Sequence, residues 1–173
     1  MAGLVSNRKN WNGTLCLPGT HSKWVQVADN QVTAFQTYMT GELFAVCKRA
    51  TVLQHSVRTD AFSIDVFEET VKNILQHPEH AAAQVFTVRA KDLLAPTVPA
   101  DAGSRLSGIL IAMELASIRA KWTFDTVTLV GDPALCQRYR QALRLTGVST
   151  ETADAKALTI AGLTAARHSH VIA

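Results

Sequence analysis

Hydrophobic and polar residues alternate with a period of two along residues 14–38, in runs rich in β-branched and aromatic side chains. This period predicts strands. Pro18-Gly19 and Asp29-Asn30 separate the runs, and such pairs favour tight turns. We therefore expect an irregular segment at residues 1–13 and then three strands, of which the last two form an antiparallel hairpin. The predicted strands are Thr14–Leu17, Lys23–Ala28 and Gln31–Tyr38.

Beyond residue 39 the apolar positions recur at helical spacing. Thr40 is expected to cap a first helix, with Glu42 in its first turn. The expected apolar face of this helix contains Leu43, Phe44, Val46, Cys47 and Ala50. A second helix is predicted over Asp60–Gln76. After it we expect a short turn at Ala81–Ala83, a strand or extended loop at Val85–Arg89, and a loop at Leu93–Gly103.

The clearest helical pattern covers Ser104–Trp122, which is apolar on nearly all sides and is therefore expected to lie between layers. Thr126–Val130 is a β-branched run without a polar face, which is typical of a central, buried strand. A helix ending near Gly147, a strand at Val148–Thr152 and a helix at Ala155–Arg167 complete the chain. This order, βββα, a helical insertion and then αβαβα, predicts an α/β fold with a mixed sheet covered by helices.

Composition narrows the class of protein. The 173 residues are 47% hydrophobic and 18% charged, which suits one folded domain and argues against disorder of the whole chain. The net charge is +3 with scattered basic residues, so we expect no nucleic-acid surface. Three distant cysteines without a CxxC pair predict buried thiols of a reducing cytoplasm. We find no signal peptide or membrane span and expect a soluble, cytoplasmic protein.

The first candidate for chemistry is the turn between the first two predicted strands. It contains a glycine, two hydroxyls and a lysine within Leu17–Trp24. Exposed N–H groups in such a turn, together with Thr20 and Ser22, can hold phosphate oxygens. A plain β-turn with polar residues is the alternative explanation. The GxxxxGK[ST] motif occurs nowhere, which excludes a P-loop.

Four strings, in this order and spacing, resemble the 2-dehydro-3-deoxygalactonokinase family. They are LCLPGTHSKWV at 15–25, YMTGELF at 38–44, LSGILI at 106–111 and LVGDPALCQRY at 129–139. The resemblance covers roughly residues 14–167 and implies an actin-like, hexokinase-like ATPase fold of the ribonuclease H type. That fold has two lobes, each built on βββαβαβα, with ATP and substrate in the cleft between them.

The resemblance further implies that residues 14–173 form the C-terminal lobe and that the N-terminal lobe is absent. No predicted strand carries the Asp-x-Gly-Ser/Thr phosphate turn expected of the first lobe. Gly19 and Thr20 would then form the second phosphate-binding turn, with His21 and Ser22 beside it.

Other residues of the matching strings receive roles in the same way. Thr40, Gly41 and Glu42 would line the cleft near the phosphates or the sugar acid, and Glu42 is the candidate catalytic base. Gly131 and Asp132 would adjoin the adenosine, where the chain leaves the central strand. An N-cap followed by Pro133 explains Asp132 equally well without a ligand.

Three further candidates come from the residues themselves. Arg89 is a candidate for the substrate carboxylate, or else an ordinary surface arginine. Glu114 lies inside an apolar helix, where it faces the cleft, reaches solvent, or pairs with Arg119 or Lys121. His77 and His80 follow a helix end, and no metal site is expected there.

The activity implied by the resemblance is phosphoryl transfer from Mg-ATP to O6 of 2-dehydro-3-deoxy-D-galactonate, with ATP and Mg²⁺ as the cofactors. A chain lacking the first lobe is expected to be impaired or inactive alone, and its open cleft face is expected to favour a homodimer. The alternative is a non-catalytic nucleotide-binding or assembly module derived from this lobe.

Overall fold

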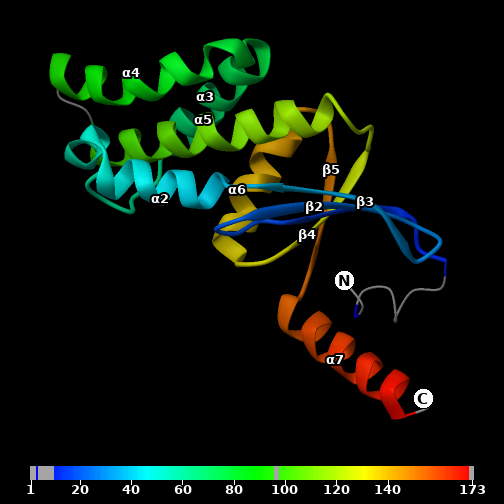
Figure 1. Ribbon diagram of the computed structural model, residues 1–173. Helices are drawn as coiled ribbons and strands as arrows, with labels where there is room; N and C mark the ends of the chain where they lie inside the picture. The colour runs from blue at the N-terminus through cyan, green and yellow to red at the C-terminus, as the bar shows by residue number, and fades with distance from the viewer. Residues whose placement is uncertain (1–2, 4–9, 96–97, 172–173) are drawn as a thin grey trace.

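The computed structural model describes residue 3, residues 10–95 and residues 98–171 of the chain (Figure 1). Its strands are β1 (Gly13–Leu17), β2 (Ser22–Ala28), β3 (Gln31–Tyr38), β4 (Thr126–Val130) and β5 (Ser149–Ala153). Its α-helices are α2 (Thr40–Ala50), α3 (Ile64–Gln76), α4 (Ala81–Leu94), α5 (Pro99–Arg119), α6 (Pro133–Arg144) and α7 (Ala155–Val171). Two short 3₁₀ helices are η1 (Val52–His55) and η2 (Pro78–His80).

The five strands form one mixed sheet in the order β3-β2-β1-β4-β5, which confirms the predicted mixed α/β fold. The pairs β1–β2 and β2–β3 are antiparallel, whereas β1–β4 and β4–β5 are parallel. Asp29 and Asn30 join β2 to β3 with φ angles of 48° and 64°, as in a type I′ hairpin turn. Because β1, β4 and β5 run parallel, their carboxyl ends lie at the same edge of the sheet.

The two faces of the sheet are covered unequally. Side chains of Cys16, Trp24 and Leu129 point into a large core shared with the helices that precede and follow β4. Their neighbours Leu15, Val25 and Val130 point to the other face, where a smaller core includes residues at the start of α7. This alternation along each strand follows from the two-residue period of the pleat. Figure 1 shows α7 leading away from the sheet on that second face.

Helix α5 lies at the centre of the helical part of the molecule, beside α2, α3 and α4 (Figure 1). Twelve of its residues are buried, in agreement with the prediction of a helix packed between layers. It begins at Pro99, five residues before the predicted start, because proline suits the first helical position. The predicted loop at Leu93–Gly103 was therefore too long. Asp101–Ser104, which has the letters of an Asp-x-Gly-Ser phosphate turn, lies inside this helix.

The prediction of a turn at Ala81–Ala83 followed by a strand or loop at Val85–Arg89 was wrong. Both segments belong to α4. Ala81 and Val88 are buried and Val85 is partly buried, a helical spacing that packs one side of α4 on the core. The alternation of β-branched residues suggested a strand, and packing of this helical stripe overrides that propensity.

Helix α2 also departs from expectation in two respects. Thr40 is the first helical residue and not the N-cap, which is Met39 and provides no side-chain cap. Phe44 and Cys47 pack on the core, but Leu43 and Val46 are 44% and 47% exposed, so the predicted apolar face is only half buried. Within the described ranges, no helix combines the length and apolar character needed to cross a membrane.

Candidate functional site

The turn between β1 and β2 lies directly under the first residues of α2. A side chain at Gly41 would meet the carbonyl oxygen of Gly19 and come within 2.8 Å of the Cα of Thr20, so only glycine allows this approach. The amide of Glu42 donates to the carbonyl oxygen of Thr20 at 2.9 Å. A small cavity of ≈ 70 Å³ beside the contact is lined by Gly19, Gly41 and Arg138, among others.

The end of β4 adjoins the same turn. A Cβ built on Gly131 would lie 3.0 Å from the carbonyl oxygen of Pro18, tighter than ordinary packing. Since β1 and β4 are parallel neighbours, Pro18 and Gly131 both follow the carboxyl ends of their strands. The structure thus brings together the turn that the sequence analysis assigned to phosphate binding and the glycine that it assigned to the adenosine.

One face of the turn carries an exposed histidine–glutamate pair. His21 Nε2 lies 2.5 Å from Glu42 Oε2, and the two side chains are 48% and 41% exposed. Thr20 is exposed as well. Within the described part of the chain, no hydrogen bond occupies the backbone N–H groups of Gly19 and Thr20. The turn therefore has two amides without a hydrogen-bond partner among the described residues, and its open side carries a hydroxyl, an imidazole and a carboxylate.

Beneath the turn, Glu114 of α5 is the centre of a buried hydrogen-bond network. Its Oε1 accepts from Trp24 Nε1 at 2.6 Å, and its Oε2 accepts from Tyr139 OH at 2.9 Å and from Thr40 Oγ1. Ser22 Oγ lies 2.8 Å from Tyr139 OH. Ser22 is fully buried, so it supports the turn from below and does not line its open side.

Burial controls the titration of this network. Desolvation raises the pKa of the Glu114 carboxyl, and the hydrogen bonds from Thr40, Trp24 and Tyr139 oppose that rise. Desolvation, together with the nearby Glu114 charge, raises the pKa of Tyr139 well above its ordinary value. Of the alternatives that the sequence left open for Glu114, pairing with Arg119 or Lys121 was wrong, because its partners are neutral donors on three other elements.

A larger pocket of ≈ 680 Å³ opens between the carboxyl ends of β4 and β5. Gly131, Arg140 and Lys156 are among its lining residues. Arg140 donates to Thr152 Oγ1 at 3.3 Å, while its buried Nε has no hydrogen-bond partner. Arg140 and Lys156 suit an anionic ligand, and the carboxylate of Asp154, which also lines the pocket, accepts from the amides of Lys156 and Ala157. The sequence analysis missed Arg140 and Lys156, since neither stands in a motif.

Asp132 has a structural role that needs no ligand. Its side chain accepts from the amide of Leu135 at 2.9 Å, and Pro133 takes the first helical position of α6. This arrangement confirms the capping explanation offered from the sequence. Asp132 is also exposed at the mouth of the strand end, beside Gly131.

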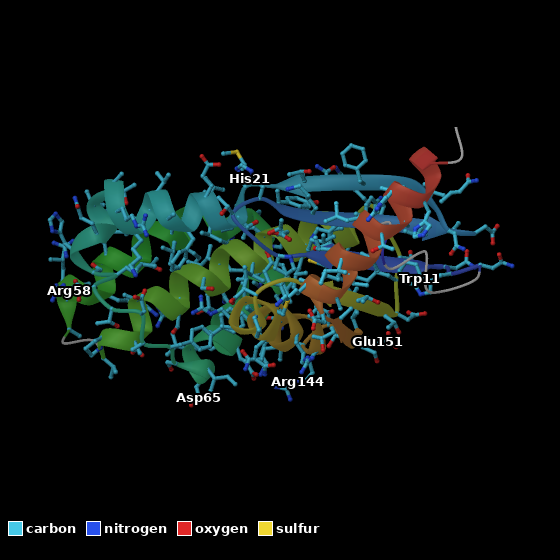
Figure 2. All side chains as sticks on the ribbon, turned by 90° about the horizontal axis from the view of Figure 1, so that it is seen from below. Trp11, His21, Arg58, Asp65, Arg144 and Glu151 are labelled. Carbon is cyan, nitrogen blue, oxygen red and sulfur yellow. The ribbon has the colours of Figure 1, made fainter. Side chains whose placement is uncertain are left out.

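Arg89, the candidate for the substrate carboxylate, is not brought to the turn. Its guanidinium lies 3.1 Å from Asp92, which also pairs with Arg58 at 3.3 Å. Figure 2 shows Arg58 at one end of the helical part, whereas His21 lies at the junction of α2 and the sheet. The structure therefore pairs Arg89 with Asp92, away from the other candidate residues.

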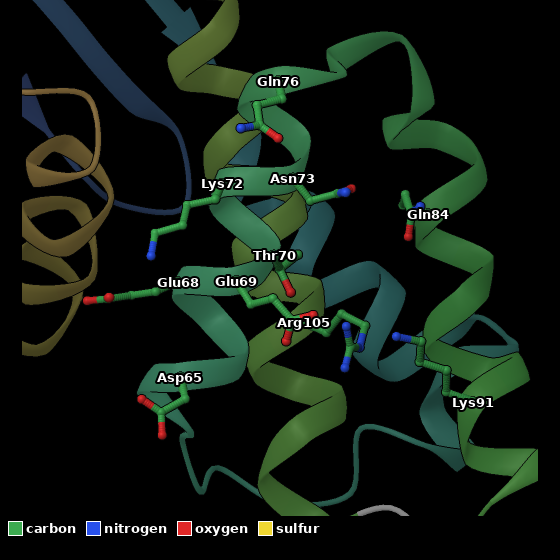
Figure 3. Close-up of a pocket in the computed structure, with 10 residues that line it drawn as sticks. All are labelled: Asp65, Glu68, Glu69, Thr70, Lys72, Asn73, Gln76, Gln84, Lys91 and Arg105. Atoms are coloured by element: carbon green, nitrogen blue, oxygen red, sulfur yellow. The ribbon is translucent and has the colours of Figure 1, made fainter.

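Another groove, of ≈ 620 Å³, lies among α3, α4 and α5 (Figure 3). Both acidic and basic side chains line it, with Glu69, Lys91 and Arg105 as examples. Glu68 at its rim pairs with Arg144 of α6 at 2.7 Å. The mixed charges favour no single ligand class, and none of the candidate site residues lines this groove.

Within the described residues, histidine, cysteine and carboxylate groups gather closely enough for a metal ion at His77, Glu79 and His80. All three side chains are exposed, with Glu79 Oε1 at 3.4 Å from His77 Nδ1 and 3.8 Å from His80 Nε2. They lie at the turn between α3 and α4, and no buried donor orients them. They form no part of the turn beneath α2.

Comparison with known proteins decides which family this geometry represents. The family model for 2-keto-3-deoxy-galactonokinase matches residues 1–166. The chain belongs to this family. A protein of Rhizobium meliloti (strain 1021) that is named as a probable 2-dehydro-3-deoxygalactonokinase is 42% identical over 156 residues, or 88% of this chain and 51% of the relative. The 2-dehydro-3-deoxygalactonokinase of Escherichia coli (strain K12) is 36% identical over 133 residues, or 76% of this chain and 45% of the relative.

A solved structure agrees with the family assignment. The crystal structure of a protein from Sinorhizobium meliloti, titled as a 2-dehydro-3-deoxygalactonokinase, superposes with a TM-score of 0.90 at 39% identity. The match covers 97% of this chain and 57% of that one. The family member described here therefore spans about half the length of the relatives it matches.

Proposed function

We propose that this chain forms the C-terminal, ATP-binding lobe of a 2-dehydro-3-deoxygalactonokinase with an actin-like, ribonuclease H-type fold. In this proposal, residues 14–173 are the lobe. The substrates are ATP and the sugar acid, and the γ-phosphoryl group passes to O6 of 2-dehydro-3-deoxy-D-galactonate. Family membership favours this proposal over a non-catalytic binding module.

One observation carries the proposal: the turn after β1 and the end of β4 meet at a single edge of the sheet, with the start of α2 packed on the turn. Ligands of α/β proteins bind beyond the carboxyl ends of parallel strands. Free amides in a turn, close to a helix N-terminus, favour phosphate oxygens. Gly19 and Thr20 are the proposed phosphate ligands, with His21 beside them.

The candidate catalytic base, Glu42, fits this arrangement by its position. Its carboxylate is half exposed on the open side of the turn and already holds His21. In the proposed reaction, the sugar O6 attacks the γ-phosphorus, the bond to the β–γ bridging oxygen breaks, and ADP leaves. Glu42 accepts the proton of O6. Thr40 is buried against Glu114, so Gly41 and Glu42 line the open side and Thr40 supports them.

The pocket between β4 and β5 suits the nucleotide. Its volume of ≈ 680 Å³ and its cations Arg140 and Lys156 match the size and charge of a nucleoside phosphate. Gly131 joins this pocket to the turn, because it lines the pocket and touches Pro18.

In this proposal the chain does not hold Mg²⁺ by itself, because the described residues around the turn gather no set of metal ligands. Glu42 is engaged with His21, and Asp132 caps α6. The ion would therefore be held by the phosphates of ATP, with at most one carboxylate from this chain. When bound, it neutralises charge on the transferred phosphoryl group.

Calorimetric titration of the purified 173-residue chain tests the nucleotide half of the proposal. We expect Mg-ADP to bind, and Lys156→Ala to weaken that binding by roughly 1 kcal/mol, since a charge-assisted contact is lost. Lys91→Ala is the matched control, because it removes the same charge from the groove of Figure 3. Failure of Mg-ADP to bind at millimolar concentration, or equal losses in both variants, would refute the assignment of this pocket.

A separate assay tests the acceptor. The sugar acid and ATP are incubated with the chain, and with the chain mixed with a polypeptide that supplies the other half of a relative. The proposal predicts phosphate on O6 in the mixture and little or none with the chain alone. Phosphate at another hydroxyl, or transfer to unrelated sugars at the same rate, would contradict the substrate named here.

A further inference from the structure

Glu114 connects three of the segments around the proposed phosphate-binding turn: β2, α2 and α6. Trp24 belongs to β2, which leaves the turn; Thr40 is the first residue of α2, which covers it; and Tyr139 belongs to α6, which follows Gly131. The three donors reach one carboxylate, Trp24 at 2.6 Å and Tyr139 at 2.9 Å, with Thr40 as the third donor. Glu114 itself is only 2% exposed and touches none of the proposed ligands.

The hydrogen bonds in this network have a fixed direction. An indole N–H can only donate, so Glu114 Oε1 is an acceptor. The hydroxyl of Tyr139 donates its one proton to Oε2, and the hydroxyl of Ser22 must then donate to Tyr139. An ionised carboxylate accepts all three donors at once, whereas a protonated one would have to donate to one of them. The relay from Ser22 through Tyr139 to Glu114 therefore ends on an acceptor.

Two hydroxyls of this network, those of Thr40 and Ser22, lie next to the turn, so the network and the turn depend on each other's position. Thr40 precedes Gly41, whose contact with Gly19 and Thr20 leaves no space for even a methyl group. Ser22 is the first residue after the turn. A shift of either hydroxyl moves the turn and the start of α2 relative to each other, and the free amides of the turn with them.

We propose that Glu114 is the positioning residue of the phosphate-binding turn, holding β2, α2 and α6 in the arrangement that a nucleotide phosphate requires. The inference rests on the proposed function for its ligand and on the hydrogen-bond network for its geometry. Glu114 acts through Thr40, Tyr139 and Ser22 and does not contact the phosphate itself.

Substitutions separate this role from charge and from general stability. In Glu114→Ala all three donors lose their acceptor. In Glu114→Gln the amide oxygen still accepts from Trp24, while the NH₂ group donates to the hydroxyls of Thr40 and Tyr139, which can turn to accept. The glutamine variant keeps the shape of the network without its charge. Ser104→Ala is the matched control, because it removes a buried hydrogen bond elsewhere on α5, to the backbone N–H of Ser63.

The experiment records amide and indole N–H signals by NMR and measures Mg-ADP affinity at a temperature at which every variant is folded. Glu114→Ala is expected to weaken Mg-ADP binding roughly tenfold, as indirect positioning residues do. It should also shift the amide signals of residues 19–21 and 41–42 and the indole signal of Trp24. Glu114→Gln should retain most of the affinity, and Ser104→Ala should leave both the affinity and the turn signals unchanged.

The outcomes separate the two proposals. If Glu114→Ala is folded and binds Mg-ADP as the unaltered chain does, the positioning role is refuted. The role is also refuted if Ser104→Ala causes the same loss of affinity. If the unaltered chain binds no nucleotide, the proposed function fails, and unmoved turn signals in Glu114→Ala would then refute the positioning role independently. Should Glu114→Ala not fold, Thr40→Val severs the link to α2 alone and is judged by the same signals.

Discussion

The two loops that leave the parallel strands β1 and β4 lie side by side but are stabilised in different ways. The loop after β4 is held locally, by Asp132 capping α6 and Pro133 starting it. The turn after β1 is held by residues distant in the chain, through Gly41 above it and Glu114 below it. A local cap can be recognised from neighbouring residues, whereas a turn held by distant contacts reveals its role only when the chain is folded.

The largest expected effect concerns the support beneath the turn. Glu114→Ala leaves three buried donors without an acceptor, and each such loss costs about 1–3 kcal/mol, so the free energy of unfolding should fall by about 3 kcal/mol or more. Urea denaturation of the variant and of Ser104→Ala measures the difference. A loss below that of Ser104→Ala would show that the turn does not depend on this network.

The raised pKa of Glu114 predicts how the free energy of unfolding varies with pH. Burial raises the pKa of Glu114 in the folded chain above its ordinary value of 4.5. The folded state therefore binds this proton more tightly than the unfolded state. The associated stability is fully present below pH 4.5 and is lost as the pH rises through the folded-state value.

Comparison with Glu114→Gln isolates this effect, because glutamine does not titrate. The stability of the unaltered chain relative to the variant should decline as the pH rises from 4.5. Thermal unfolding of both chains across that range measures it. A difference that is constant with pH, or that increases, would contradict the raised pKa.

Much of the fold followed from local patterns, whereas part of the site followed from the resemblance of four strings to a known family. The two-residue period located all three N-terminal strands, and the buried run Thr126–Val130 predicted the central strand β4. The strings around Gly19, Gly41 and Gly131 identified residues that the fold does bring together.

The failures have a common physical cause. Helix α4 and the partners of Glu114 depend on which surfaces meet in the folded chain, and local propensity does not contain that information. Glu114 was noticed because a carboxylate inside an apolar helix needs partners. Its actual donors, Trp24, Thr40 and Tyr139, lie 90, 74 and 25 residues away in sequence. Arg89 was assigned by residue type alone, and Asp92 accounts for it.

Crowding above the turn gives the next prediction. Gly41→Ala forces a methyl group against the backbone of Gly19 and Thr20, and overpacking of this kind costs about 1–3 kcal/mol. Gly103→Ala is the matched control: both glycines are helical, but a Cβ at Gly103 meets its nearest atom at 3.5 Å. The control should be stabilised by about 0.5–1 kcal/mol through helix propensity. Equal changes in the two melting temperatures would mean that α2 does not press on the turn.

The helix cap in the loop after β4 should contribute less to stability than the contacts around the turn after β1. Asp132→Ala removes the acceptor of the Leu135 amide and should cost about 1 kcal/mol of stability. Asp132→Ser retains a capping oxygen without the charge and should restore most of that loss. If nucleotide affinity falls in both variants while stability recovers in the serine variant, the carboxylate contacts the ligand as well as the helix.

The smallest effect on stability is expected on the open side of the turn, and there stability and function should separate most clearly. Glu42 and His21 are about half exposed, and an exposed pair of this kind contributes only about 0–1 kcal/mol. Glu42→Gln should therefore unfold at nearly the same urea concentration as the unaltered chain. In the reconstituted mixture of both halves, however, the variant should lose most of the phosphoryl transfer, because its amide cannot accept the proton of O6. If the variant transfers phosphate at the unaltered rate, Glu42 is not the base and serves only as a partner of His21. The turn after β1 would then bind phosphate without taking part in the chemistry.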